Sequence, residues 1–410
     1  MAELESELIN RPEPLAWLDS WRDKDIIKVV TGARRVGKST LLSLFQAELS
    51  AAGVPKTHIV TVNLEDPTLS DLLGDHKKLY KYIKSKVPKS AGTTYLFIDE
   101  IQNAESFERV VDGLYILPSV DLYLTGSSSH LLSGALATLL TGRYVEYHLK
   151  PFSFAEFVAA KAAGTNPPIR DLYDEYVRVG GFPFAASLND DDQIRQYLEG
   201  IINTILLADI AQTLKVANPA QLRAITEFVF SDIGNLTSAK RIADAMTSAG
   251  RPISRPTVGN YLTGLTDAFL VYPAKRWDIR GKRLLENGEK HYIVDTGMRR
   301  TLLGSRPVDA GHVLENLVYV ELLRRPGKVY VGKIDSKEVD FVVENDEGTT
   351  FIQVALNVDD PDTLNRELDS LRAIPGYDKR VLLTLDREPP QSYDGIRRMS
   401  AYDFLLGAPL

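Results

Sequence analysis

GARRVGKS, at residues 32–39, fits the pattern GxxxxGK[ST] and decides the fold of this chain. It follows IIKVV (26–30), a mostly β-branched run typical of a buried strand. After it, KSTLLSLFQAELSAAG (38–53) has the pattern of a helix that ends at a glycine. Strand, glycine loop and helix in this order are the context of a P-loop, which binds phosphate at a helix N-terminus. The segment therefore predicts nucleotide binding.

The positions of this loop have different expected tasks. Gly32 and Gly37 permit the tight turn, and backbone N–H groups of residues 35–40 can surround the β-phosphate. Lys38 is the cation for the β- and γ-phosphates, and the next hydroxyl coordinates Mg²⁺. The loop arginines can contact phosphate or a neighbouring subunit, or can be solvated. With ATP and Mg²⁺ as cofactors, the expected binding residues are Gly32, Ala33, Arg34, Arg35, Val36, Gly37, Lys38, Ser39 and Thr40, and the metal ligands are Ser39 and Asp99.

Two acidic residues end a second apolar strand. TTYLFIDE (93–100) places Asp99 and Glu100 at a carboxyl strand end, where parallel sheets bind ligands. Asp99 is expected in the magnesium shell, and Glu100 is expected to polarise the attacking water. The alternative is a strand that ends in two acids without a catalytic task.

Ser127 and Arg143 are candidates for contact with the γ-phosphate. Ser127 lies at the end of VDLYLTGSS (120–128), beside the same sheet edge, as a polar sensor or as a turn former. Arg143, in LLTGRY, can act across a subunit boundary as an arginine finger, or can be a surface arginine. Together with Lys38 and Glu100, they are the expected catalytic residues.

Alternating strand and helix patterns predict an α/β fold with a mainly parallel sheet over residues 1–150. Residues 151–215 are dominated by helical patterns and are expected to form a lid subdomain. Residues 216–306 show three helices followed by a β-hairpin, the outline of a winged helix-turn-helix. Residues 307–410 have the pattern of a small α/β domain of their own.

Composition narrows the class of protein. The 410 residues are 44% hydrophobic and 25% charged, as in ordinary globular proteins, and the absence of cysteine excludes disulfides, thiolate zinc sites and a cysteine nucleophile. No apolar run is long enough to span a membrane, and the acidic N-terminus does not resemble a secretory signal, so we expect a cytoplasmic protein without membrane partners.

The charge is unevenly distributed. The net charge is −7, but residues 238–300 contain twelve Lys and Arg against six Asp and Glu, so this stretch has +6 and the rest −13. A basic winged helix predicts phosphate contacts with DNA, whereas a protein–protein module, or charge complementarity with the acidic remainder, is the alternative. The expected DNA contacts are Arg255, Thr257, Lys275, Arg276, Arg280, Lys282 and Arg283.

The chain resembles a family of bacterial and archaeal ATP-binding proteins that join an AAA-type ATPase core, related to archaeal and STAND-type ATPases, to a C-terminal domain of unknown function. The resemblance rests on GARRVGKST, YLFIDEIQNAESF, LTGSSSHLLSG, TGRY, PFSFAEF, GGFP (180–183), DTGMRR (295–300) and LENLVYVEL (314–322). It covers nearly the whole chain. It implies ATP hydrolysis, oligomers, a winged helix and a terminal domain similar to PD-(D/E)xK nucleases.

The nuclease-like motif departs from that pattern. A PD-(D/E)xK site needs an aspartate on one strand and (D/E)-x-K on the next to hold Mg²⁺. The matching residues are Asp340 and Gln353-Val354-Ala355, so the lysine and one acid are missing. Glu315, Asp340 and Gln353 are therefore expected to form a degenerate site, and nuclease activity is not expected.

These features favour an oligomeric, Mg²⁺-dependent ATPase that acts as a DNA-binding or remodelling motor, with ATP/ADP, DNA and further copies of the chain as partners. The alternative is a STAND-like switch, in which bound nucleotide controls recruitment of a protein partner. Gln102, in the DEIQ segment, lies close to Glu100 but has no separate expected task.

Overall fold

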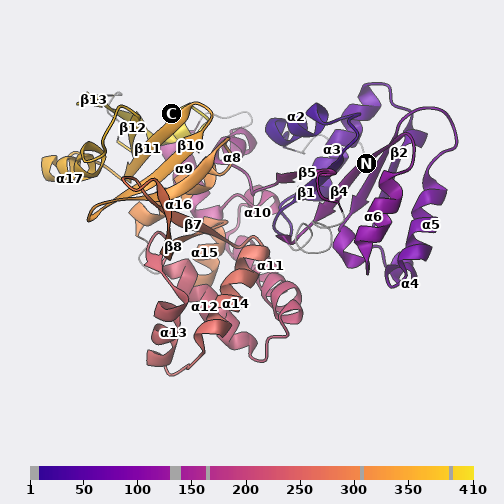
Figure 1. The fold of residues 1–410 in the computed structure, drawn as a ribbon, viewed down its shortest axis with the longest axis horizontal. Helices are drawn as coiled ribbons and strands as arrows, with labels where there is room; N and C mark the ends of the chain where they lie inside the picture. The colour runs from indigo at the N-terminus through magenta and orange to yellow at the C-terminus, as the bar shows by residue number, and fades with distance from the viewer. Residues whose placement is uncertain (1–8, 130–139, 163–166, 305–308, 387–390) are drawn as a thin grey trace. The chain divides into compact units, whose positions relative to one another are not determined.

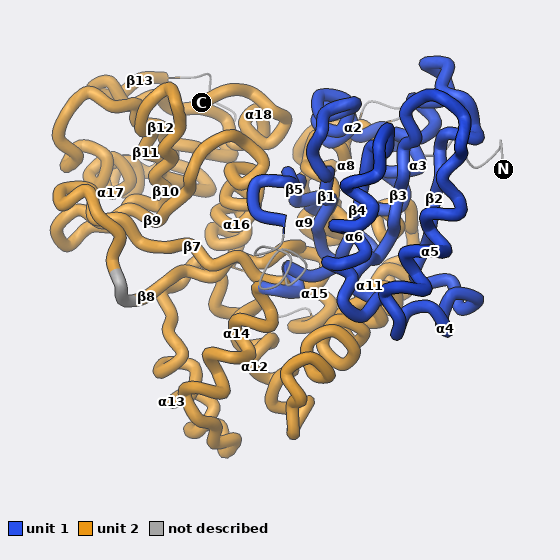
Figure 2. Tube along the Cα trace, turned by 45° about the vertical axis from the view of Figure 1, so that its right-hand side comes forward, with its two compact units in different colours: residues 1–151, 267–269 blue, residues 152–266, 270–410 orange. Residues whose placement is uncertain are grey.

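A computed structural model describes residues 9–129, 140–162, 167–304, 309–386 and 391–410 (Figure 1). The chain divides into two compact units (Figure 2). Unit 1 contains residues 1–151 with 267–269, and unit 2 contains residues 152–266 with 270–410. Within the described ranges, no helix combines the length and the apolar character that crossing a membrane requires.

Unit 1 is built on a five-stranded parallel sheet in the order β2-β3-β4-β1-β5. This confirms the predicted α/β fold with a parallel sheet. The strands are β1 (Ile27–Thr31), β2 (Ile59–Asn63), β3 (Thr94–Asp99), β4 (Val120–Gly126) and β5 (Tyr144–His148). The helices are α2 (Pro12–Ser20), α3 (Lys38–Ala51), α4 (Ser70–Leu73), α5 (His76–Lys86) and α6 (Phe107–Tyr115), with short 3-10 turns η1 (Lys56–His58), η2 (Pro67–Leu69) and η3 (Ile101–Asn103).

The central strands are buried on both faces, which explains their continuous apolar runs. Successive residues of β3 alternate between two hydrophobic clusters: Leu96 and Ile98 pack in one, and Phe97 in the other. In the second cluster, Phe97 stacks on Tyr123 of β4 at 4.8 Å between ring centroids. The sheet is thus fixed from both sides, and its carboxyl edge presents the loops that follow β1, β3 and β4.

Unit 2 begins with a helical region. Its elements up to residue 303 are α8 (Phe154–Lys161), α9 (Ile169–Val179), α10 (Pro183–Ser187), α11 (Asp191–Thr204), the π-helical segment η5 (Ile205–Ala211), α12 (Pro219–Ser231), α13 (Ala239–Ser248), α14 (Arg255–Asp267) and α15 (Thr296–Leu303). The order α12, β6, α13, α14, β7, β8 matches the predicted sequence of three helices and a hairpin.

The second sheet joins nine of the described strands in the order β13-β14-β12-β11-β10-β9-β7-β8-β6. Strand β7 pairs in parallel with β9, so the hairpin and the terminal α/β region share one sheet, although the sequence pattern placed a boundary between residues 306 and 307. The strands are β6 (Leu236–Thr237), β7 (Val271–Asp278), β8 (Arg283–Ile293), β9 (Lys328–Ile334), β10 (Lys337–Asn345), β11 (Gly348–Ala355), β12 (Lys379–Thr384), β13 (Ser392–Tyr393) and β14 (Ile396–Ser400), accompanied by α16 (Ala310–Leu322), α17 (Pro361–Arg372) and α18 (Ala401–Leu405).

A buried carboxylate joins distant parts of unit 2. Asp295 caps α15 by accepting a hydrogen bond from Met298 N (2.9 Å), and it also accepts one from Gly181 N (2.6 Å). A Cβ at Gly180 would lie 2.2 Å from Asp295 Oδ1, so glycine is required there. The GGFP and DTGMRR segments therefore contact each other, and both have a structural role in this joint.

The Asp295 joint predicts a pH-dependent stability. Burial raises the pKa of Asp295 to about 6, against the lowering effect of its backbone donors. Because the folded chain then binds this proton more tightly than the unfolded chain, the stabilising contribution is complete below about pH 4 and is lost as the pH rises through 6. At about 1.4 kcal/mol per pH unit, the loss amounts to about 3 kcal/mol.

Chemical denaturation of the parent and of Asp295→Asn at several pH values measures this effect. Between pH 4 and pH 7, we expect the free energy of unfolding of the parent to fall by about 3 kcal/mol relative to that of Asp295→Asn. The same substitution at the exposed Asp171 is the matched control. A difference between parent and Asp295→Asn that stays constant over this range would contradict the prediction.

Candidate active site

The phosphate loop connects β1 to α3 through two glycines with positive φ angles. Gly32 has φ 151° and Gly37 has φ 99°. A Cβ at Gly32 would lie 2.3 Å from the carbonyl oxygen of Leu149, so the loop cannot close with a larger residue. No side chain of the described residues caps the N-terminus of α3, and its first turn contains no acid. The first-turn N–H groups are therefore available to an anion.

Lys38 is buried inside the loop. Its Nζ donates to the carbonyl oxygens of Gly32 (3.1 Å) and Ala33 (3.3 Å) and lies 3.4 Å from Glu100 Oε1. Burial lowers the pKa of Lys38, and the neighbouring Glu100 carboxylate partly offsets this effect. The ammonium group is thus placed among acceptors that a phosphate oxygen can replace.

The expected magnesium ligands contact each other. Ser39 Oγ donates to Asp99 Oδ2 at 2.6 Å. Thr125 Oγ1, on β4, donates to Asp99 Oδ1 and accepts from Glu100 N at 2.9 Å. A hydroxyl and one carboxylate fit Mg²⁺, which binds few protein ligands and keeps several waters or phosphate oxygens. When bound, the ion would be held by Ser39 and Asp99.

Glu100 lies at the centre of a hydrogen-bond cluster. Its Oε2 accepts from Gln102 Nε2 (2.5 Å) and from Ser127 Oγ (3.0 Å), while Oε1 faces Lys38. Burial raises the pKa of Glu100, but Lys38, Gln102 and Ser127 outweigh this and lower it overall. The carboxylate is therefore ionised and held by donors. Sequence analysis placed Ser127 at this edge but assigned no role to Gln102. The only feature of the sequence that pointed to Gln102 was its position two residues after Glu100.

The remaining loop residues differ in exposure. Ala33 and Val36 are buried, whereas Ser39, Thr40 and Arg35 are exposed. Arg34 Nη1 lies 3.4 Å from Glu65 Oε1, so this arginine has a carboxylate partner in its own chain.

Arg143 lies at the amino ends of the strands, whereas the phosphate loop lies at their carboxyl ends. It immediately precedes β5, and its carbonyl oxygen accepts from Ile27 N at the beginning of β1. The phosphate loop follows the end of β1. The guanidinium group is paired with Asp112 at 2.8 Å and lies over the Tyr115 ring. Its expected role as an arginine finger for a neighbouring subunit stays a prediction.

The candidate DNA-contact residues lie on α14 and on the β7–β8 hairpin of unit 2. Arg280 is paired with Asp335 (2.9 Å), and Arg283 lies 4.0 Å from Asp278, so part of the basic charge is balanced within the chain. Arg255, Lys275 and Lys282 are exposed, whereas Thr257 and Arg276 are half-buried. Thr257 Oγ1 shares a hydrogen bond with Ser254 Oγ at 2.7 Å.

One of the residues expected to form a degenerate nuclease site, Glu315, contacts a buried lysine that sequence analysis did not assign. Lys290 Nζ, on β8, lies 2.9 Å from Glu315 Oε1 and 2.7 Å from Glu338 Oε1. Asp340 accepts from Val354 N (2.9 Å), and burial, with the Glu315 charge, raises its pKa despite Lys290. Gln353 Oε1 accepts from Asp340 N (3.4 Å), and its Nε2 donates to Glu367 on α17 (3.0 Å). Among the described residues, no group of three or more His, Cys, Asp or Glu side chains is arranged to hold a metal ion.

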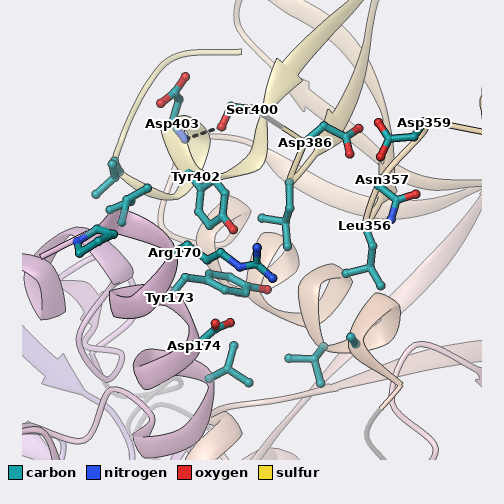
Figure 3. A pocket seen from close by; sticks show the side chains of 17 residues that line it. Arg170, Tyr173, Asp174, Leu356, Asn357, Asp359, Asp386, Ser400, Tyr402 and Asp403 are labelled. Carbon is teal, nitrogen blue, oxygen red and sulfur yellow. Dashed lines mark hydrogen bonds between the residues drawn. The ribbon is translucent and has the colours of Figure 1, made fainter. Parts of the chain in front are cut away.

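A cavity lies at the carboxyl ends of β11, β12 and β14, wholly within unit 2 (Figure 3). It has a volume of about 1470 Å³, and none of the expected nucleotide-binding residues line it. Figure 3 shows Arg170, Tyr173 and Tyr402 gathered on one side and Asn357, Asp359 and Asp386 on the other. Asp386 is already paired with Arg398 at 2.6 Å.

Two protein-family models match the chain. The first is described as an AAA domain and matches residues 24–158, and the second is a domain of unknown function that matches residues 170–309. An uncharacterized protein of Haemophilus influenzae is 37% identical over 400 residues, which is 97% of this chain and 99% of that protein. An uncharacterized protein of Methanocaldococcus jannaschii is 28% identical, over 87% of this chain and 78% of its own length.

Solved structures show a weaker likeness. The Walker-type ATPase PABY2304 of Pyrococcus abyssi is 17% identical with a TM-score of 0.49, covering 72% of this chain and 96% of that one. The Aeropyrum pernix ORC1 protein, solved in complex with DNA, is 12% identical with a TM-score of 0.33, covering 73% and 93%. Likeness at this level does not support an argument about function.

The Lys290 cluster predicts a large loss of stability when its cation is removed. Lys290→Met leaves Glu315 and Glu338 without their shared partner, and breaking a buried ion pair in this way costs about 3–5 kcal/mol. Lys337→Met, which removes an exposed lysine 3.6 Å from Asp369, is the matched control and should cost no more than about 1 kcal/mol. Equal losses in denaturant unfolding would show that Lys290 does not balance this cluster.

Proposed function

We propose that the chain, which belongs to the same family as its Haemophilus influenzae relative and matches an AAA domain over residues 24–158, binds ATP with Mg²⁺ and hydrolyses it to ADP and phosphate. The main support is the meeting of Lys38, the Ser39–Asp99 pair and Glu100 at one edge of the parallel sheet. Lys38 and Ser39 begin α3, whereas Asp99 ends β3 and Glu100 follows it. Together these groups provide a phosphate cation, metal ligands and a base.

Each residue of the site has a separate role in the proposed reaction. N–H groups at the start of α3 bind the phosphates, and Lys38 exchanges its loop carbonyls for phosphate oxygens. Mg²⁺, when bound through Ser39 and Asp99, neutralises charge on those oxygens. Glu100 accepts a proton from the attacking water, and Ser127 offers a hydroxyl beside the γ-phosphate. The cluster around Glu100 keeps this base ionised near neutral pH.

Within this function we propose that the protein is an oligomeric DNA-remodelling motor. The order of helices and hairpin from α12 to β8 supports a winged helix, with α14 and the exposed Lys275 and Lys282 facing DNA. Oligomers follow from the AAA-type family, with Arg143 as the candidate finger in trans. The terminal domain would serve in binding or in assembly of the oligomer rather than cleave DNA, since Lys290 balances its carboxylates.

One observation favours the STAND-like switch as a second candidate. Arg280 and Arg283 are paired with acids of their own chain, which reduces the charge that the hairpin can offer to DNA. A protein partner would then replace DNA, and nucleotide would control its recruitment. The two candidates differ in whether DNA changes the ATPase rate.

Two substitutions separate binding from hydrolysis. Lys38→Ala should weaken nucleotide binding by roughly 10- to 150-fold, because charged hydrogen bonds contribute about 1.5–3 kcal/mol. Glu100→Gln should retain ATP but lower kcat by roughly 100-fold or more, because only the base is lost. Titration with a fluorescent ATP analogue and a phosphate-release assay measure the two effects.

The matched controls for these variants are Lys56→Ala and Glu105→Gln, both at exposed positions of unit 1. They should leave binding and turnover at the parent values. If Glu100→Gln hydrolysed ATP at the parent rate, the proposed base would be wrong.

A motor should bind DNA through the hairpin in a salt-dependent way. We expect the double variant Lys275→Ala/Lys282→Ala to weaken duplex binding and to lower the salt slope by about 2, roughly 1 for each phosphate contact. Fluorescence anisotropy at several salt concentrations measures this. Lys77→Ala/Lys81→Ala, on exposed positions of α5, changes the net charge equally and is the control.

The ATPase rate with single-stranded, duplex and branched DNA completes this experiment. Stimulation by DNA, together with nucleotide-dependent oligomers, supports the motor. A rate that no DNA changes, from a protein that retains nucleotide tightly, would favour the switch instead.

A further inference from the structure

The Gln102 side chain lies between the base and the candidate sensor. Its Nε2 donates to Glu100 Oε2 at 2.5 Å and to Ser127 Oγ at 3.1 Å. Ser127 Oγ in turn donates to the same carboxylate oxygen at 3.0 Å. The three side chains form a closed triangle at the carboxyl ends of β3 and β4.

The chemistry of these partners fixes the orientation of the amide. An ionised carboxylate only accepts hydrogen bonds, so the Gln102 nitrogen must face Glu100 and its oxygen must point away. That oxygen, Oε1, is buried and has no hydrogen-bond partner among the described residues. Leaving a buried acceptor unsatisfied costs about 1–3 kcal/mol, so the hydrogen bonds from Nε2 to Glu100 and Ser127 set the orientation of the amide against this cost.

The backbone directs Gln102 back towards Glu100. Glu100 has φ 53° and ψ 51°, a left-handed conformation that costs roughly 1–2 kcal/mol for a residue with a side chain. Its N–H donates to Thr125 Oγ1 (2.9 Å), and its carbonyl oxygen accepts from Asn103 N (3.1 Å). This turn ends β3 and begins η3, so that a side chain two residues further on returns to the carboxylate.

We propose that Gln102 is a positioning residue for hydrolysis: its Nε2 holds the Glu100 carboxylate in the orientation in which Glu100 accepts the proton of the attacking water. This inference rests on the proposed function, in which Glu100 is the base. The water oxygen forms a bond to the γ-phosphorus, and its proton passes to Glu100. The bond from the γ-phosphorus to the β,γ-bridging oxygen breaks, and ADP leaves with that electron pair.

A merely structural Gln102 and a positioning Gln102 differ in their kinetic signatures. The amide holds the carboxylate that accepts a proton during hydrolysis, through the hydrogen bond from Nε2 to Glu100 Oε2. Removing the amide therefore lowers kcat through the hydrolysis step. Nucleotide affinity, which depends on the phosphate loop, should not change.

Gln102→Leu tests this directly, since leucine keeps the volume and removes both polar atoms. We expect kcat to fall roughly 10- to 100-fold, somewhat below the loss seen for a direct transition-state donor, with KM and analogue affinity within about twofold. Gln46→Leu, at a half-buried position on α3, is the matched control and should leave kcat and KM unchanged.

Gln102→Glu is the second variant and keeps the side-chain shape if leucine prevents folding. Its carboxylate lacks the Nε2 donor and repels Glu100, so kcat should fall at least as far as in Gln102→Leu. If the parent hydrolyses ATP and both variants retain its kcat, the role of Gln102 is wrong and the proposed function stands. If the parent does not hydrolyse ATP, the proposed function and this inference both fail. If Glu100→Gln is fully active, the assigned base and this inference fail, while ATP hydrolysis itself stands.

Discussion

The burial of Lys38 beside Glu100 is the interaction on which the site in unit 1 depends. Neither charge could remain under the sheet edge alone, because an uncompensated buried ion costs several kcal/mol. The 3.4 Å separation favours the charged form of both groups, and the loop carbonyls of Gly32 and Ala33 accept hydrogen bonds from Lys38 Nζ. A phosphate group can replace these acceptors without leaving the lysine unpaired. The same pair therefore stabilises the loop and prepares it for an anion.

Unit 2 balances buried charge in a different way. Lys290 is enclosed by Glu315 and Glu338, and Tyr292 also donates to Glu315 at 2.5 Å. These partners belong to β8, β10 and α16, so the cluster joins the hairpin to the terminal α/β region across the shared sheet. Lys290 thus supplies the positive charge that balances these carboxylates within the chain. The carboxylates consequently stabilise the fold.

Local sequence patterns predicted the strands, helices and turns that depend on residues close together in the sequence. They did not predict contacts between residues that are far apart in the sequence. The apolar runs of β1, β3 and β4 and the glycine spacing of the loop were sufficient to predict the strands and the loop that form the candidate site. Strand β5 was missed because YVEYH is only half-buried and alternates weakly. The β7–β9 pairing, the Lys290 cluster and the Asp295 joint connect residues far apart in sequence. The spacing of apolar residues along the chain does not indicate such contacts.

Gln102 shows why a site residue can be visible in the sequence and still lack a task. An amide two residues after an acid would point away from it in a strand and could be solvated in an ordinary turn. Only the left-handed backbone at Glu100, held by Thr125 and Asn103, returns the amide to the carboxylate. The same turn exposes Glu100 Oε2 to Ser127 on the next strand. The left-handed backbone at Glu100 thus brings together three side chains from two strand ends. Hydrogen bonds that orient the Glu100 carboxylate offset the energy that this conformation costs.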